Sequence, residues 1–213
     1  KPDEEEVVKP DDDEEKDDSD TFTGTINGHE WIDLGLSVKW ATCNVGASKP
    51  ENYGDYYAWG ETTTKSDYEF DTYKWCKGTI DTMTKYCTGS YYGTVDNRTT
   101  LTSSDDVATV KWGSKWRMPT KEEMEEWDED CTWTWTTQNG VNGMKVTGPN
   151  GNSIFLPAAS ARNGTELDGR GSYGFYWSGA LGENFSYYAY NLKFDSGFRN
   201  WGNGSRDNGH TVR

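Results

Sequence analysis

The chain has 213 residues and a formal net charge of -15, from 36 acidic and 21 basic side chains. Only 32% of its residues are hydrophobic but 15% are aromatic, a composition that excludes disorder of the whole chain because each ring can bury a large apolar area. It contains no apolar run near the roughly 20 residues of a membrane helix, and its acidity argues against nucleic acid as a partner.

The first 20 residues differ in composition from the rest of the chain. Residues 1–20 carry 12 acidic and 3 basic side chains and no aromatic ring, whereas the remaining 193 residues have a net charge of -6. Since only Val7 and Val8 offer apolar surface, this segment cannot offset its own ordering entropy. We expect a disordered acidic tether over residues 1–20, or simply an acidic terminus, followed by one domain over residues 21–213.

The next part of the chain predicts short strands and long loops. Residues 28–41 favour two strands around a tight turn near residues 34–37, because Trp31 and Trp40 have the aromatic character that strands favour. Residues 44–70 are punctuated by glycine and proline, and residues 71–110 are polar. We expect irregular connections there, with at most one short helix near residues 104–110.

A helix is predicted over residues 121–129. Thr120 precedes it as the N-cap residue, and Glu123 three positions later completes a capping box. Met124 and Trp127 lie on one face of that helix and should face the core.

The C-terminal half predicts hairpins. Asn139-Gly140 and Asn142-Gly143 lie in the first hairpin region, and residues 149–152 separate two further strand patterns. More strand patterns follow at residues 173–179, 188–194 and 197–201. One helix is followed by short antiparallel strands and long loops. This pattern, with few helices in all, favours an α+β fold in one compact domain.

Several of these segments together resemble a known family. Residues 116–127 (WRMPTKEEMEEW) resemble the helix motif of the formylglycine-generating-enzyme-like branch of the C-type-lectin-like fold. GFYWSG (174–179) and GHTVR (209–213) resemble its closing strands. Residues 29–47 and 53–61 are similar to the start of related Bacteroidetes surface proteins. The resemblance covers roughly residues 24–213. It implies that fold, and a likeness to the variable proteins of diversity-generating retroelements, whose C-terminal segment is a ligand-binding face.

The composition of the C-terminal segment is compatible with such a face. Asn, Tyr, Ser, Asp, Gly and His make up 21 of the 33 residues from Ser178 to His210. Antibody loops have a similar composition, although Gly, Asn and Ser are also ordinary turn residues. We therefore expect a binding face over about residues 183–210, with these ligand-binding residues: Asn184, Phe185, Tyr187, Tyr188, Asn191, Lys193, Phe198, Asn200, Asn203, Ser205, Asn208 and His210.

Strand alternation refines this prediction. Tyr190, Leu192 and Phe194 should face the core, so that Asn191 and Lys193 face outward. In residues 197–201 the same alternation places Phe198 and Asn200 outward and Trp201 inward. Arg199 then shares the face of Trp201, where a hydrophobic residue would be expected.

The cysteines give little support to catalysis. The four cysteines (Cys43, Cys76, Cys87 and Cys131) form no CxxC pair, and either a Cys76–Cys87 disulfide or four free thiols fit the spacing. The enzymes of the resembled family use a late cysteine pair, but no cysteine follows Cys131. We expect no catalysis and no cofactor, although the resemblance is compatible with a structural calcium ion.

The expected function is that of a surface-displayed ligand-binding protein. Its partner would be a protein or a neutral glycan on another cell or host surface, because net negative charge disfavours polyanions. The acidic segment resembles the region after the lipidated cysteine of exported surface lipoproteins, so a lipid anchor would lie outside this chain at the outer membrane. The alternatives are a structural subunit of a cell-surface assembly and an enzyme related to the formylglycine-generating group.

Overall fold

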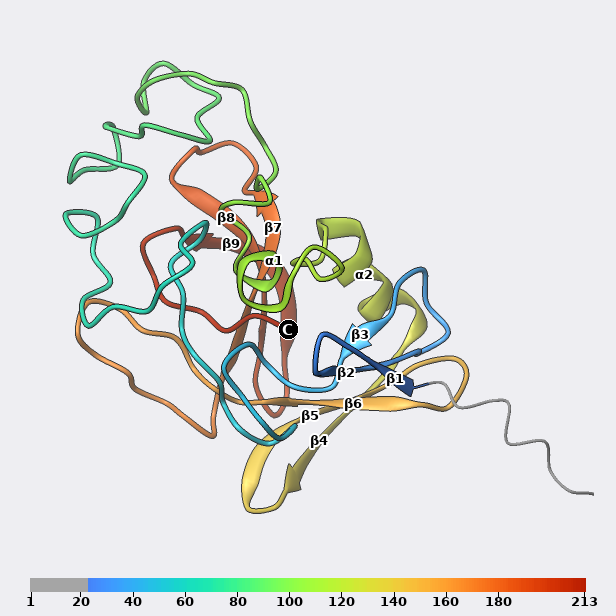
Figure 1. Ribbon diagram of the computed structural model, residues 1–213. Helices are drawn as coiled ribbons and strands as arrows, with labels where there is room; N and C mark the ends of the chain where they lie inside the picture. Colours follow the sequence, from blue (N-terminus) through green and yellow to red (C-terminus); the bar gives the residue numbers. More distant parts are fainter. Residues whose placement is uncertain (1–22) are drawn as a thin grey trace, which may run out of the picture.

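The structure is a computed structural model that describes residues 23–213 (Figure 1). The predicted tether over residues 1–20 lies outside these residues. The elements, in chain order, are β1 (Thr23–Ile26), β2 (His29–Ile32), β3 (Trp40–Ala41), α1 (Val107–Trp112), α2 (Lys121–Asp130), β4 (Thr132–Gln138), β5 (Val141–Thr147), β6 (Ser153–Pro157), β7 (Gly174–Leu181), β8 (Tyr188–Phe194) and β9 (Arg199–Ser205).

The strands form three antiparallel sheets of three strands each. Their orders are β1-β2-β3, β4-β5-β6 and β7-β8-β9, so within each sheet the strands that are adjacent in sequence pair with each other. The hairpins arise where the sequence predicts them: Asn139 and Gly140, both with positive φ, connect β4 to β5, as an Asn-Gly turn requires. The strands predicted around residues 34–37 are confirmed as the β2–β3 pair.

The predicted α+β class is wrong. The described residues contain two short helices, of 6 and 10 residues, against nine strands, and this composition fits a mostly β fold. The class was predicted from one clear helix signal, as if that helix formed a whole layer of the fold. In the structure α2 is a single short element against β7 and β8.

The helices themselves lie close to their predicted positions. α2 begins at Lys121 after the N-cap Thr120, and both hydrogen bonds of the capping box are present. Met124 and Trp127 are buried on its inner face, as expected. The short helix expected near residues 104–110 is α1, which begins at Val107, three residues after the start of that range, and ends at Trp112.

The C-terminal sheet lies between two hydrophobic clusters. One contains Leu192 and Phe194 of β8, together with Trp127 of α2 and the inner faces of β5 and β6. The other contains Ala189 of β8 and Trp177 of β7, together with Trp59 and α1. As the central strand, β8 is therefore covered on both faces along most of its length, unlike a strand with one solvated face.

A long irregular connection joins β3 to α1. It lies beside the turn between β7 and β8, as the green segment and the orange turn show (Figure 1). It is packed by buried tyrosines whose hydroxyls donate to backbone carbonyls, such as Tyr68 to Tyr56 at 2.7 Å and Tyr73 to Trp59 at 2.7 Å. Within residues 23–213 no helix has the length and apolar character needed to cross a membrane.

Candidate functional site

Five aromatic rings gather at the surface where the β7–β8 turn meets the long connection. We call this set the aromatic surface: Tyr91, Tyr92, Phe185, Tyr187 and Tyr188. Tyr92 contacts Phe185 and Tyr187 edge to face, with ring centroids 6.1 and 5.5 Å apart. Tyr91 is 77% exposed and Phe185 is 41% exposed. Single exposed rings are common on protein surfaces, but a group of neighbouring rings is typical of a contact site.

The two segments that carry these rings are joined by hydrogen bonds. The backbone N–H of Thr88 donates to the Ser186 hydroxyl at 3.0 Å, and the two hydroxyls lie 3.3 Å apart. Ser186 is fully buried although its neighbour Phe185 is exposed. The Ser186 side chain therefore fixes the β7–β8 turn against the segment that leads to Tyr91.

Arg206, which follows β9, joins the same two segments from the interior of the domain. Its side chain is fully buried. Nη1 donates to the carbonyl oxygens of Ser186 at 2.6 Å and Tyr86 at 3.1 Å, and Nη2 donates to that of Lys85 at 3.1 Å. The guanidinium also lies 5.0 Å from the ring centroid of Trp59. One side chain thus satisfies carbonyls of both segments under the aromatic surface.

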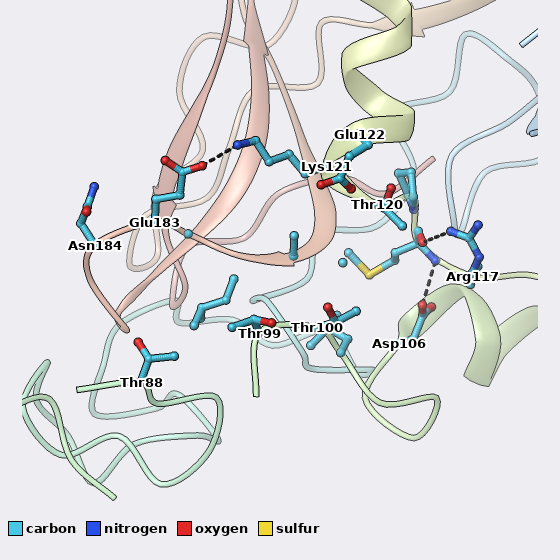
Figure 2. Close-up of a pocket in the computed structure, with 17 residues that line it drawn as sticks. Thr88, Thr99, Thr100, Asp106, Arg117, Thr120, Lys121, Glu122, Glu183 and Asn184 are labelled. Atoms are coloured by element: carbon cyan, nitrogen blue, oxygen red, sulfur yellow. Dashed lines mark hydrogen bonds and ion pairs between the residues drawn. The ribbon is translucent and has the colours of Figure 1, made fainter. Parts of the chain in front are cut away.

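A cleft of about 740 Å³ is lined in part by residues of the same two segments, the long connection and the β7–β8 turn (Figure 2). We call it the threonine cleft, because Thr88, Thr99, Thr100 and Thr120 line it. Its other walls are residues 179–184, from the end of β7 into the turn, and residues 117–122 at the start of α2. Figure 2 shows Thr88 and Asn184 at one end and Asp106 and Arg117 at the other. Asn184 is followed by Phe185, and Thr88 is hydrogen-bonded to Ser186, so this end of the cleft lies next to the aromatic surface.

The charged side chains of the cleft are largely paired. Lys121 Nζ lies 2.5 Å from Glu183 Oε1, and Arg117 lies 2.5 Å from Glu123. The hydrogen bond with Lys121 lowers the pKa of Glu183, and the same bond raises the pKa of Lys121. At the far end Asp106 is buried and caps α1, and its burial raises the pKa of the carboxyl group. The cleft therefore presents two ion-paired cations, the Glu122 carboxylate and hydroxyl groups.

Seven of the twelve residues predicted from the sequence lie on this part of the C-terminal sheet or in the turns beside it. Phe185, Tyr187 and Tyr188 belong to the aromatic surface, and Asn184 lines the cleft. Asn203 and Ser205 lie on β9 opposite Tyr190 and Tyr188 of β8. Asn208 is half-buried in the turn that follows β9.

The prediction that Asn191 faces outward is wrong, and His210, predicted as a ligand-binding residue, is buried as well. Asn191 is 5% exposed and His210 is 2% exposed. The amide of Asn191 and Nδ1 of His210 lie 3.3 Å apart, and the His210 ring stacks on Trp177 at 3.8 Å. Burial lowers the pKa of His210 to about 3. The alternation argument failed here because it assumed one solvated face, whereas β8 is covered on both.

Lys193, Phe198 and Asn200 lie at the opposite end of the sheet. Since β8 rises about 3.3 Å per residue, roughly 20 Å separates Tyr188 from the end of the strand near Lys193. Lys193 and Asn200 are paired neighbours and both are exposed, as predicted, and Phe198 is 48% exposed in the turn before β9. The predicted residues therefore do not form one face but two separate groups.

The mismatch at Arg199 has a structural explanation. Its Nε lies against Asp128 of α2 in a salt bridge, and its guanidinium lies 5.5 Å from the ring centroid of Trp133. Arg199 therefore covers the edge of the cluster that contains Trp201 with its aliphatic stem and keeps its charge at the surface.

Half of the candidate site was not predicted from the sequence. Tyr91, Tyr92, Thr99 and Thr100 lie in the segment that was predicted only as an irregular connection. The local signal was the Tyr91-Tyr92 pair in a polar stretch with nothing nearby to bury it. Its partner rings come from residues more than 90 positions away, and no local pattern joins the two.

The expectations about metals and disulfides have different outcomes. All four cysteines are free, so the alternative of a Cys76–Cys87 disulfide is wrong. Among residues 23–213, His, Cys, Asp and Glu side chains form no group of three or more that could hold a metal ion. The structural calcium ion compatible with the resemblance stays a prediction.

Comparison with protein-family models, with curated proteins and with solved structures finds no match for this chain. The resemblance seen in the sequence motifs therefore stays a prediction, and the candidate site rests on its own geometry.

Proposed function

We propose that residues 23–213 form a ligand-binding module whose ligand face consists of the aromatic surface and the threonine cleft. The observation that carries this proposal is the meeting of exposed rings from two distant segments, with Tyr91 77% exposed. Rings that served only the fold would be buried, as Trp59 and Trp127 are. The fixed backbone beneath the rings further supports binding, because an ordered face loses less entropy when a ligand binds.

The partner would be a protein or a neutral glycan, and the module would be displayed at the cell surface on its acidic N-terminal segment. The composition of residues 1–20 and of residues 178–210 supports this part of the proposal. Diversification of the C-terminal segment by a retroelement is a further proposal on the same grounds. A reverse-transcriptase gene and a near-copy of the 3′ coding segment beside this gene would support it, and their absence from the locus would contradict it.

The binding proposal is tested with two double variants. The domain is probed against one array of glycans and one array of extracellular proteins. Tyr91→Ala with Phe185→Ala should abolish the strongest signal. Tyr173→Ala with Phe198→Ala is the matched control, since these rings are 41% and 48% exposed away from the candidate face. An equal loss in both double variants, or no binding on either array, would contradict the proposal.

A further inference from the structure

We infer that the ligand of this face is a neutral oligosaccharide whose chain lies in the threonine cleft and extends onto the aromatic surface. This inference rests on the function proposed above and specifies the ligand for the same site. Its basis is the shape of the cleft, its hydrogen-bonding groups, its charge and the rings at its end.

The shape favours a small or narrow ligand. The cleft of about 740 Å³ falls within the range of roughly 300–1,000 Å³ that is typical of small-molecule sites. An interface with a folded protein instead buries about 800 Å² of accessible surface on each partner, which is more than a single cleft provides. An oligosaccharide of a few units fills a concave cleft and can continue beyond its end.

The polar groups of the cleft match those of sugars. Thr88, Thr99 and Thr100 are all exposed in the cleft, as is the side-chain amide of Asn184. A threonine hydroxyl both donates and accepts, and an amide offers two donors and an acceptor. A sugar hydroxyl also does both, so each can pair with these groups in either direction.

The charges disfavour an anionic ligand. Lys121 is already paired with Glu183 at 2.5 Å, and Glu122 lines the cleft next to it (Figure 2). A uronic acid or a sulfate group could accept from Lys121 only beside the carboxylates of Glu183 and Glu122, which would repel it. A neutral sugar can instead accept from Lys121 and donate to Glu183 without breaking their pairing.

The rings complete the match. A pyranose presents a flat face of C–H groups that packs on an aromatic ring. The aromatic surface offers rings in several orientations: Phe185 is nearly perpendicular to Tyr188, with an interplanar angle of 87°. Figure 2 shows Asn184 and Thr88 at one end of the cleft; Asn184 is followed by Phe185, and Thr88 is hydrogen-bonded to Ser186, so a chain leaving the cleft at this end approaches the rings.

Calorimetric titration of the full domain tests the inference. The probes are neutral tetra- to hexasaccharides of glucose, mannose, galactose, xylose and N-acetylglucosamine, together with uronic acid and sulfated oligosaccharides of the same lengths. At least one neutral series should bind. Tyr91→Ala and Phe185→Ala should each weaken that binding by about tenfold, since each removes a half-exposed or exposed ring from the contact.

The hydroxyls are tested with isosteric variants. Thr99→Val and Thr100→Val should each weaken binding by about threefold or more through a lost hydrogen bond. Thr134→Val, at an exposed position of β4, and Phe198→Ala are the controls and should leave the affinity unchanged.

The outcomes separate this inference from the proposed function. Binding restricted to acidic oligosaccharides would overturn the neutral class. Failure of every oligosaccharide, combined with a protein array signal that requires Tyr91 and Phe185, would overturn the sugar class but leave the proposed binding face in place. Neutral binding that is insensitive to all four site variants would overturn both.

Discussion

Arg206 should be among the most important single residues for the stability of the domain and of its candidate face. The variant Arg206→Met keeps most of the apolar stem but removes the guanidinium. The carbonyl oxygens of Tyr86 and Ser186 then lose their donor at a buried site, and that of Lys85 loses its donor at a partly buried one. Each buried group left unsatisfied costs about 1–3 kcal/mol, so three of them, with partial relaxation, predict a loss of about 3–5 kcal/mol.

The loss is measured by urea unfolding, with Arg199→Met as the matched control. Arg199 is also an arginine in a salt bridge, but both partners are about 40% exposed, so its removal should cost less than about 1 kcal/mol. Hydrogen exchange should rise selectively in residues 85–93 and 183–188 of Arg206→Met, because the two segments are no longer joined. If Arg206→Met were no less stable than Arg199→Met, the role assigned to the buried guanidinium would be refuted.

Three further predictions concern other parts of the fold. Trp201→Ala should cost about 3 kcal/mol in thermal melts, because Trp201 packs beside Trp127 and Trp133. Phe198→Ser should change stability by less than about 0.5 kcal/mol, because Phe198 is exposed. The reverse order would refute the faces assigned to these residues. Thr120→Ala should cost about 1 kcal/mol through loss of the capping box, and an unchanged urea midpoint would contradict this. Burial lowers the pKa of His210 to about 3, so the unfolded chain binds a proton there below about pH 6.5 that the folded chain does not bind. Neutral His210 therefore contributes its full stabilisation above about pH 6.5, and below this pH the free energy of unfolding falls by about 1.4 kcal/mol per pH unit. His210→Gln should reduce this fall between pH 6 and 4. Equal slopes for the variant and the unmodified domain would contradict the prediction.

Features encoded by neighbouring residues could be predicted from the sequence. The α2 N-terminus needs only Thr120 and Glu123, three positions apart, and the β4–β5 hairpin needs only the Asn139-Gly140 turn. Both depend on hydrogen bonds and backbone angles within a few residues, and both are confirmed.

Features that depend on distant segments could not be predicted in this way. Asn191 alternates with core residues as an outward residue would, but it is buried because a second hydrophobic cluster covers that face of β8. Arg199 is understandable only once α2 brings Asp128 beside it. The candidate face itself exists because the long connection brings Tyr92 to Phe185, a contact that no periodicity in either segment specifies.

The most direct test of the binding face is hydroxyl-radical footprinting of the domain, alone and saturated with the strongest-binding neutral oligosaccharide. Tyr91 and Phe185 should become protected from oxidation, because both are exposed in the free domain and would be covered by the ligand. Phe198 and Tyr173, which are similarly exposed elsewhere, should be oxidised to the same extent in both samples. Protection of Phe198 or Tyr173 with no change at Tyr91 and Phe185 would contradict the assignment of this face.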